Sequence, residues 1–306
     1  MAGSSQIQPK IHYSFNNVGS LKPYLQLTRP ANLVTAVADI FAGMAIAQFT
    51  FSTFSPAYLI ISTLGLYAGG VVMNDVFDAK LDSIERPERP IPSGKVALRS
   101  AAMMGISLLF LGIFAAAMYS FESGLIAIGV ALLTVIYNRF AKHHAFLGPL
   151  TMGMCRGGNL ILGMSVIPES INRWGIIAVL PIAYIFAITM ISQDEVHGGK
   201  KRTLYIAAIL YLVVLAAQLV ISQKLGNILF TVPFVLLHAW LIGRPLWNAI
   251  QNPVGLLIGK AVKAGVISLI VMNASWCVAF GFWPVALVVL ALLPLSMLLA
   301  RIFAVT

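Results

Sequence analysis

Apolar and polar stretches alternate along this chain, and ten apolar segments dominate it. They lie near residues 30–49, 56–74, 96–118, 123–138, 146–167, 173–192, 203–222, 227–243, 261–280 and 283–303. Each is close to the length that an α-helix needs to cross about 30 Å of hydrocarbon. The pattern predicts an all-α fold, a polytopic membrane helical bundle of nine to ten transmembrane helices. Residues 1–20 are expected to form a flexible tail, and residues 21–306 a single transmembrane domain, which opens with a short interfacial helix over residues 20–30.

Composition supports a membrane protein. Hydrophobic residues make up 59% of the chain and charged residues only 10%, whereas soluble domains carry about 25% charged residues. No cleavable signal peptide is visible, so we expect the first span to direct insertion. The two cysteines lie in apolar runs and suggest neither a disulfide framework nor a thiolate metal site.

The net charge of +10 is explained by basic loops on one side of the membrane rather than by nucleic-acid binding. With the N-terminus in the cytoplasm, 17 of the 20 Lys and Arg residues fall on the cytoplasmic side, 2 fall outside, and Arg156 lies within a span. This asymmetry predicts an even number of spans in the cytoplasmic membrane, with both termini inside. It also places the loops after spans two, four and six on the same side.

The loop after the second span concentrates the chemistry. Four of the ten acidic residues lie at Asp75, Asp78, Asp82 and Glu85. In a continuing helix, Asn74, Asp78 and Asp82 are four residues apart and share one face. Oxygen ligands that lie this close repel one another unless a cation sits between them, and hard oxygen ligands suit Mg²⁺. The alternative is a helix end with solvated acids.

Basic residues follow this acidic stretch and recur on the same side of the membrane. Arg86 and Arg89 suit phosphate recognition, and the loop after span four adds Arg139 and Lys142. The loop after span six brings further acids, bases and a candidate metal ligand, at Asp194, Glu195, His197, Lys200, Lys201 and Arg202.

Acids and bases at one mouth of an apolar bundle predict an amphiphilic ligand, with a diphosphate held by Mg²⁺ and cations, and a tail between helices. A polyprenyl diphosphate has this chemistry. Magnesium and cations would stabilise the leaving diphosphate, and a cavity within the membrane would exclude water from the allylic carbocation.

Three of the polar residues inside predicted spans are candidates for a functional role. Asp39 is in the middle of the first, and Arg156 and Asn159 are three residues apart in the fifth. An ionisable residue in a membrane often marks a functional site. A structural role, in which Arg156 pairs with Asp39 or another polar group, is equally compatible with the sequence.

These residues also resemble a known family. The spacing Asn74-Asp75-x-x-Asp78-x-x-x-Asp82, followed by Arg89-Pro90-Ile91-Pro92-Ser93-Gly94, resembles the first signature of the UbiA superfamily of intramembrane prenyltransferases. Arg29-Pro30, Tyr137 with Lys142, and Gly199 with Thr203 are similar to further positions of that family. The resemblance implies a bundle of about nine spans, a lateral opening to lipid, and Mg²⁺-dependent transfer of a prenyl group to an aromatic or other small acceptor.

The chemistry of the residues and the resemblance together suggest roles for individual residues. Metal binding falls to Asn74, Asp78, Asp82, Asp194 and Glu195, and catalysis to Asp75, Asp78, Asp82, Tyr137 and Glu195. The candidates for substrate binding are Arg29, Asn32, Arg86, Arg89, Arg139, Lys142, Arg156, Asn159 and Lys201.

Two features depart from the family pattern. The second signature has two aspartates four residues apart, and alignment on Gly199 and Thr203 places these positions at Ile191 and Glu195. A tenth span is also present. The local sequences around Arg29 and Glu195 look like those of the divergent EboC-type branch. The sequence therefore predicts a UbiA-like prenyltransferase. The alternatives are a non-catalytic protein of the same fold that binds or transports a lipid diphosphate or a hydrophobic precursor and, more remotely, an unrelated secondary transporter.

Overall fold

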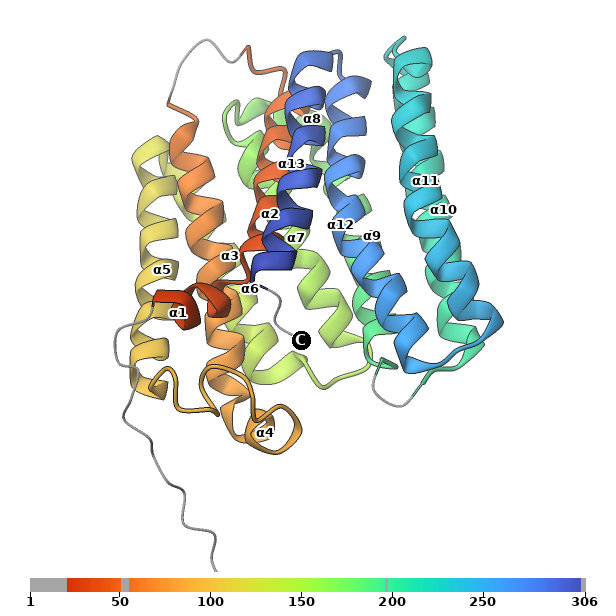
Figure 1. Cartoon of the computed structure of the whole chain (residues 1–306). Coiled ribbons are helices and arrows are strands. Elements are labelled where there is room, and N and C mark those ends of the chain that lie inside the picture. Colours follow the sequence, from red (N-terminus) through yellow and green to blue (C-terminus); the bar gives the residue numbers. More distant parts are fainter. Residues whose placement is uncertain (1–20, 51–54, 196–197, 304–306) are drawn as a thin grey trace, which may run out of the picture.

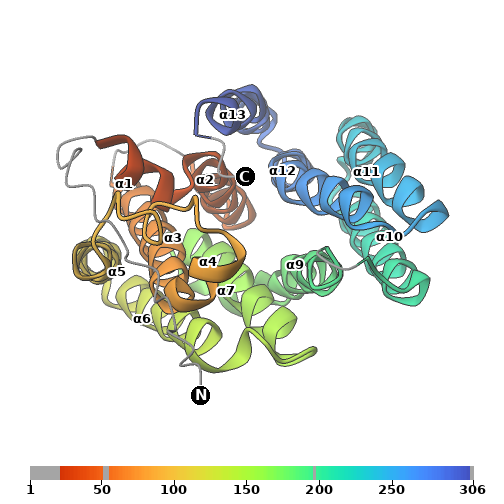
Figure 2. The same cartoon turned by 60° about the horizontal axis from the view of Figure 1, so that its bottom comes forward.

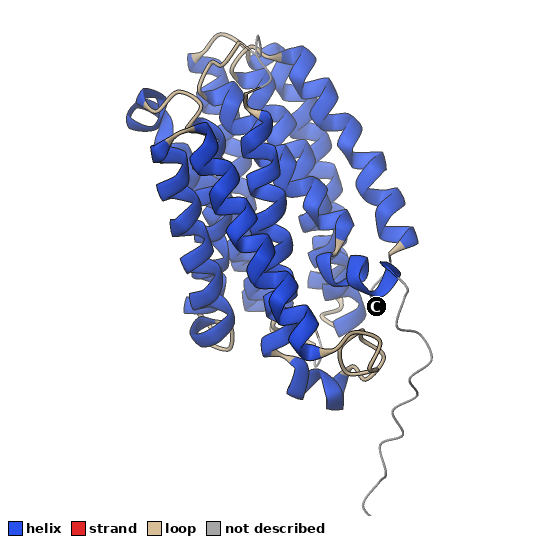
Figure 3. Cartoon of the chain, turned by 90° about the vertical axis from the view of Figure 1, so that its left-hand side faces the viewer, coloured by secondary structure: helices blue, strands red, loops and turns tan. Residues whose placement is uncertain are grey.

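The computed structural model describes residues 21–50, 55–195 and 198–303. The predicted tail over residues 1–20 lies outside this part of the chain. Every regular element in the described ranges is helical, as Figure 3 shows, and no strand occurs among them. The all-α prediction is therefore confirmed.

Ten long helices correspond to the ten apolar segments. They are α2 (Pro30–Ile46), α3 (Ala57–Phe77), α5 (Leu98–Tyr119), α6 (Phe121–Ile136), α7 (Leu147–Met164), α9 (Val179–Ser192), α10 (Lys201–Lys224), α11 (Ile228–Gln251), α12 (Gly255–Ala279) and α13 (Trp283–Ile302). Shorter elements complete the described part: α1 (Leu21–Thr28), α4 (Ala79–Glu85), the π-helix η1 (Tyr137–Ala141), α8 (Glu169–Trp174) and the 3₁₀-helix η2 (Gly175–Ala178).

Eight helices of the described chain are long and apolar enough to cross a membrane. The apolar helix α2 has 17 residues and falls just short of that length. Helix α7 has 18 residues and carries Arg156, so it reads as less apolar than its neighbours. The expected count of nine to ten spans agrees with the eight helices together with these two.

The helices stand side by side and alternate in direction (Figure 1). Seen towards one end in Figure 2, α10 and α11 lie on the far side of α9 and α12 from α3, α5 and α6. One hydrophobic cluster contains residues of α2, α7, α9, α10, α11, α12 and α13. A second contains residues of α3, α5 and α6 together with α2 and α7. Helices α2 and α7 therefore connect the two parts of the core.

The polar connections gather at one end of the bundle. Those after α3, α6, α9 and α11 lie at the bottom of Figure 1, together with α4. At the opposite end are the connections after α5, α7 and α10, where Arg173 and Lys224 lie. The structure thus separates the basic residues between the two ends as the sequence suggested, and brings the acidic loops to the same end.

Helices α2 and α7 approach each other so closely that only glycine fits where they cross. A Cβ atom added at Gly43 would lie 2.4 Å from the carbonyl oxygen of Leu160 and 2.7 Å from the backbone of Gly163. Small residues at such crossings let backbones pack within a membrane, where van der Waals contact drives helix association. This crossing holds the two helices that carry the inner wall of the cavity described below.

Replacing Gly43 with alanine tests this crossing. The added methyl group has backbone on its far side, so we expect the unfolding free energy in detergent to fall by about 1–3 kcal/mol. The matched control is Gly129→Ala in α6, where a Cβ atom would meet nothing within 4 Å. Thermal denaturation of both variants measures the effect, and equal melting temperatures would contradict the close crossing.

Candidate active site

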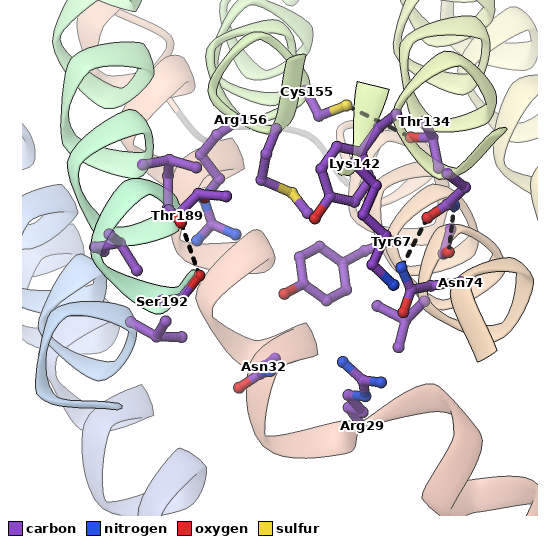
Figure 4. A pocket seen from close by; sticks show the side chains of 18 of the residues that line it. Arg29, Asn32, Tyr67, Asn74, Thr134, Lys142, Cys155, Arg156, Thr189 and Ser192 are labelled. Carbon is purple, nitrogen blue, oxygen red and sulfur yellow. Dashed lines mark hydrogen bonds between the residues drawn. The ribbon is translucent and has the colours of Figure 1, made fainter. Parts of the chain in front are cut away.

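A cavity of about 400 Å³ lies inside the polar end of the bundle, between α2, α3, α6, α7, α9 and α12. Its apolar walls are formed by Leu66, Val71, Val130, Met152, Ile185, Ile188, Val262, Val266 and Leu269. Its polar lining includes Arg29, Asn32, Thr63, Tyr67, Asn74, Asp78, Arg86, Arg89, Thr134, Tyr137, Asn138, Lys142, Arg156, Asn159, Thr189 and Ser192, several of which are labelled in Figure 4. The cavity therefore combines an apolar interior with a charged mouth.

At the mouth, Asp78 and Lys142 form an ion pair between the ends of α3 and α6. Helix α6 continues into the π-helix Tyr137–Ala141, where the backbone nitrogen of Lys142 donates to the carbonyl oxygen of Tyr137 at 2.9 Å. A π turn widens the helix and turns later side chains relative to an α-helix. The π turn occurs where Lys142 forms its ion pair with Asp78, and Tyr137, at the start of this turn, lines the cavity.

The helical ladder continues from α3 into α4, as the spacing of the first motif requires. The backbone nitrogen of Asp78 donates to Asn74 at 3.0 Å, and that of Asp82 donates to Asp78 at 2.8 Å. Asn74, Asp78 and Asp82 therefore follow one another along a helical face. Asn74 and Asp78 line the cavity, whereas Asp82 is not among the lining residues and contacts Arg89, which is.

Two arginines tie the remaining carboxylates of this motif together. Arg89 contacts Asp82 at 2.8 Å and Asp75 at 3.4 Å, and Arg29 contacts Asp75 at 2.6 Å. Arg29 has a left-handed backbone with φ of 48°, immediately before α2. Such a conformation is costly for a side chain with a Cβ atom, and here it accompanies the contact with Asp75. The cluster fixes the start of α2 against the end of α3.

An amide bridge supports the wall next to the mouth. The Nδ2 atom of Asn74 donates to the Oδ1 atom of Asn138 at 2.9 Å, and Asn138 in turn donates to the carbonyl oxygen of Gly70 at 3.1 Å. This arrangement leaves the Oδ1 atom of Asn74 without a hydrogen-bond partner among the described residues. Asn138 was missed by the sequence analysis, although its place beside Tyr137 offered a signal.

The inner end of the cavity is built around Asp39, which is 1% exposed. Its carboxylate contacts the Nε atom of Arg156 at 2.6 Å and accepts hydrogen bonds from Asn159 at 2.9 Å and Asn273 at 2.6 Å. Thr63 donates to the Oδ1 atom of Asn159 at 2.7 Å. The structural pair that the sequence left open is thus present, and Arg156 and Asn159 also line the cavity.

The second acidic loop does not place its aligned positions, Ile191 and Glu195, on the wall of the first cavity. Ile191 is completely buried and belongs to the hydrophobic core, while its neighbour Ser192 lines the cavity. Asp194 accepts a hydrogen bond from Thr203 at 2.9 Å and lines neither cavity. The position aligned with the missing aspartate therefore faces away from the site. His197 lies outside the described residues.

A second cavity of about 460 Å³ adjoins the first, between α2, α12 and α13. The two share Arg29, Asn32, Arg86, Arg89, Val262 and Val266. Glu195 reaches this second cavity and lies against Gly259. Helix α13, the extra helix of the chain, supplies Ser296 and Ala300 to its wall, and Phe303 follows directly after the helix.

Two predicted substrate-binding residues are not brought to either cavity. Arg139 lies on the exposed side of the π-helix, and Lys201 is exposed at the start of α10. Their expected part in binding stays a prediction.

Tyr67 is the main lining residue that the sequence analysis overlooked. Its ring lies near the middle of the cavity, with Arg156 on one side and Asn74 on the other (Figure 4). Tyr67 precedes Asn74 by seven residues, so both lie on the same helical face. This spacing was the available signal, but an aromatic residue within an apolar span is hard to distinguish from packing.

The donor atoms at the mouth suit a hard cation. No group of three or more His, Cys, Asp or Glu side chains that could hold a metal occurs in the described ranges. Magnesium needs only one or two carboxylates when waters and phosphate oxygens complete its shell. Asp78 and Asp82 each use one carboxylate oxygen to contact Lys142 or Arg89, and the other oxygen has no such contact among the described residues. The oxygen atoms of Asn74, Asp78 and Asp82 therefore fit Mg²⁺ chemically.

Comparison with known proteins supports the family suggested by the first motif. The sequence model described as the UbiA prenyltransferase family matches residues 36–255, which is more than half of the chain. The digeranylgeranylglyceryl phosphate synthase of Sulfolobus acidocaldarius is 30% identical over 226 residues, which cover 70% of this chain and 78% of that protein. Nothing in these matches is specific to the EboC-type branch.

Solved structures show the same fold. A UbiA homolog from Aeropyrum pernix K1 in its apo form has a TM-score of 0.66 and 15% identity, covering 79% of this chain and 96% of that one. A UbiA homolog from Archaeoglobus fulgidus, bound to GPP and Mg²⁺, has a TM-score of 0.60 and 15% identity, covering 81% and 99%. The curated relatives are named as synthases, which favours the enzymatic prediction over a non-catalytic carrier. The chain belongs to the UbiA prenyltransferase family and is a membrane-embedded enzyme of that family.

Proposed function

We propose that this enzyme transfers a prenyl group from a polyprenyl diphosphate bound in the first cavity to a small acceptor, aromatic or otherwise. The arrangement that carries this proposal is the division of the cavity into a charged mouth and apolar walls. Asp78, Lys142, Arg86 and Arg89 lie at the mouth, and aliphatic side chains line the interior. A diphosphate with an isoprenoid tail matches both parts.

The chemistry is a substitution at the first carbon of the donor. The bond between that carbon and the diphosphate oxygen breaks, and both electrons leave with the diphosphate. A nucleophilic atom of the acceptor then bonds to the allylic carbon and loses a proton. Lys142, Arg86 and Arg89 would stabilise charge on the leaving group, while the apolar walls keep water from the cation.

Asn74, Asp78 and Asp82 would hold Mg²⁺, which supplies further charge stabilisation to the diphosphate when bound. Asp75 has a supporting role in this proposal, because its contacts with Arg29 and Arg89 position the start of α2 and the loop after α4. The structure of the Archaeoglobus fulgidus homolog with GPP and Mg²⁺ supports this use of a divalent metal by analogy.

The second acidic loop would offer fewer carboxylate ligands to a metal than the full second signature of the family. Ile191 is buried and Ser192 takes the position on the cavity wall, so Glu195 is the carboxylate of this loop that reaches a cavity. We therefore infer catalysis with one tightly held Mg²⁺. Lys200, Lys201 and Arg202 are exposed and line neither cavity, so they would offset the diphosphate charge only from a distance.

The charged mouth would face the cytoplasm in the cytoplasmic membrane. This orientation rests on the excess of Lys and Arg at that end of the bundle and on the positive-inside rule. A cytoplasmic mouth would give the site access to soluble prenyl diphosphates and Mg²⁺.

Substitution Asp78→Asn tests the metal and donor site. It preserves side-chain size but removes the charge, so we expect Mg²⁺-dependent binding of geranyl diphosphate to weaken about 100-fold. Calorimetric titration of the purified protein measures this binding. The control is Glu85→Gln, because Glu85 is exposed and lines neither cavity. If both variants bind the donor like the native protein, Asp78 serves only its ion pair with Lys142 and holds no metal.

Comparison of Lys142→Gln with Arg139→Gln separates the cation on the cavity wall from its exposed neighbour. Removing a cation that contacts diphosphate costs about 1.5–3 kcal/mol, which corresponds to about 10–100-fold weaker donor binding. We expect this loss for Lys142 and a smaller one for Arg139, which lies outside the cavity lining. The reverse order in a donor titration would mean that the π-helix changes its side-chain directions when ligand binds.

Cysteine labelling tests the orientation. In a background without Cys155 and Cys277, single cysteines replacing Glu122 or Glu169 should react with an impermeant reagent added outside intact cells. Single cysteines replacing Glu85 or Lys201 should react only after permeabilisation. All four positions are exposed in the structure, so accessibility of the side chain does not limit the reaction. Reaction in the opposite pattern would invert the proposed topology.

A further inference from the structure

Helices α3 and α6 end at the same end of the bundle and keep a fixed register beside the mouth of the first cavity. Three close approaches show this register, and successive ones are four residues apart. Each joins a residue of segment 70–78 to the residue 64 positions later: Gly70 with Thr134, Asn74 with Asn138, and Asp78 with Lys142. The segment that brings Lys142 to Asp78 therefore also brings an amide to Asn74.

The carbonyl oxygen of Gly70 decides how the amide of Asn138 is turned. A carbonyl oxygen only accepts hydrogen bonds, so the Nδ2 atom of Asn138, which lies 3.1 Å from it, is the donor. The Oδ1 atom of Asn138 then faces Asn74 and accepts from its Nδ2 atom at 2.9 Å. If the Asn74 amide turned over, two oxygen atoms would face each other. The orientation of both amides thus follows from one backbone group.

This series of hydrogen bonds leaves the Oδ1 atom of Asn74 as an acceptor without a hydrogen bond among the described residues. Asn74 lines the mouth of the cavity together with Asp78 (Figure 4). An amide oxygen is a ligand that suits Mg²⁺, whereas the NH₂ group of the same amide only donates hydrogen bonds and would repel a cation. The metal set therefore needs Asn74 in the orientation that Asn138 gives it.

The position of Asn138 is itself well fixed. Its side chain is 8% exposed, and it belongs to the π-helix Tyr137–Ala141, a kind of turn that is frequent at functional sites. A Cβ atom added at Gly70 would lie 2.7 Å from the Cγ2 atom of Thr134. Glycine at this position therefore lets α6 approach closely enough for Asn138 to reach the carbonyl oxygen of Gly70.

We propose that Asn138 is a positioning residue for the metal set. It orients the amide of Asn74 so that the Oδ1 atom, and not the Nδ2 atom, is presented to a divalent cation. Groups behind metal ligands fix the orientation of those ligands, and their loss typically lowers metal affinity about 10–100-fold. Asn138 acts through Asn74, because both of its terminal amide atoms already make hydrogen bonds within the protein. The inference rests on the proposed function, since it needs the metal set named there.

Affinity for Mn²⁺ tests this role in the full-length protein. Mn²⁺ prefers the same oxygen ligands as Mg²⁺, and electron paramagnetic resonance measures its free concentration. Titrations of the detergent-solubilised protein without prenyl diphosphate report on the ligands of the protein alone. Asn138→Leu removes both hydrogen bonds with little change in side-chain size, so we expect Mn²⁺ to bind about 10-fold more weakly.

The matched control is Asn227→Leu. The Asn227 side chain also donates to a backbone carbonyl oxygen, that of Ala279 at 3.0 Å, but it lies at the opposite end of the bundle, between α10 and α11. Its replacement removes an amide hydrogen bond of the same kind far from the cavity mouth. We expect the affinity of this variant for Mn²⁺ to equal that of the native protein.

A double-mutant cycle separates the orientation of Asn74 from a general loosening of the helices. Asn74→Ala removes the ligand itself, so Asn138→Leu should have no further effect on Mn²⁺ affinity in that background. Loosened packing between α3 and the π-helix would instead displace Asp78 and weaken binding by the same factor in both backgrounds. Asn138→Ala allows the same comparison if the leucine variant does not fold.

Native Mn²⁺ affinity in the folded Asn138 variant, or an equal loss in both backgrounds, would overturn the inference. It would also be overturned if the native protein bound no Mn²⁺, because no metal set would then exist. Failure of the native protein to bind geranyl diphosphate with Mg²⁺ is a separate result. It would refute the proposed transfer, while the Mn²⁺ titrations, which contain no donor, would still decide the role of Asn138.

Discussion

Charge pairing inside the hydrocarbon region is the constraint on which this structure depends. An isolated buried charge is expensive, and the cost falls only when a partner and further hydrogen bonds surround it. Asp39 meets this requirement with Arg156, Asn159 and Asn273, which come from two other helices. The same requirement acts at the mouth, where Asp75, Asp78 and Asp82 all contact arginine or lysine. The pairs Arg29–Asp75, Asp78–Lys142 and Asp39–Arg156 join parts of the chain that are distant in sequence, so the geometry of the site is also part of what holds the bundle together.

The helical fold and the first acidic motif of the site could be predicted from sequence patterns within single segments. The ten apolar segments correspond to ten helices because segment length and hydropathy are properties of a single span. The shared face of Asn74, Asp78 and Asp82 was predictable because a helical ladder fixes spacing along one chain segment.

Partners across the bundle could not be predicted in this way. The pairing of Lys142 with Asp78 depends on a π turn, and that of Asp39 with Asn273 joins residues 234 positions apart. The facing of Ile191 into the core depends on the rotation of α9, which residue spacing alone leaves undetermined. In a sequence rich in apolar residues, the spacing of Tyr67 from Asn74 is too weak a signal to separate a cavity-lining residue from ordinary packing.

The ion pair between Lys142 and Asp78 has a consequence for the end of the reaction cycle. A diphosphate that recruits Lys142 must first separate it from Asp78, so part of the attraction between cation and anion is already engaged before the ligand arrives. When the leaving group has departed from the prenyl chain, the same two side chains compete with it by returning to each other. Because Asp78 can pair with Lys142 again, the mouth of the cavity holds the diphosphate product less tightly than a mouth lined by cations alone. The ion pair therefore favours product release.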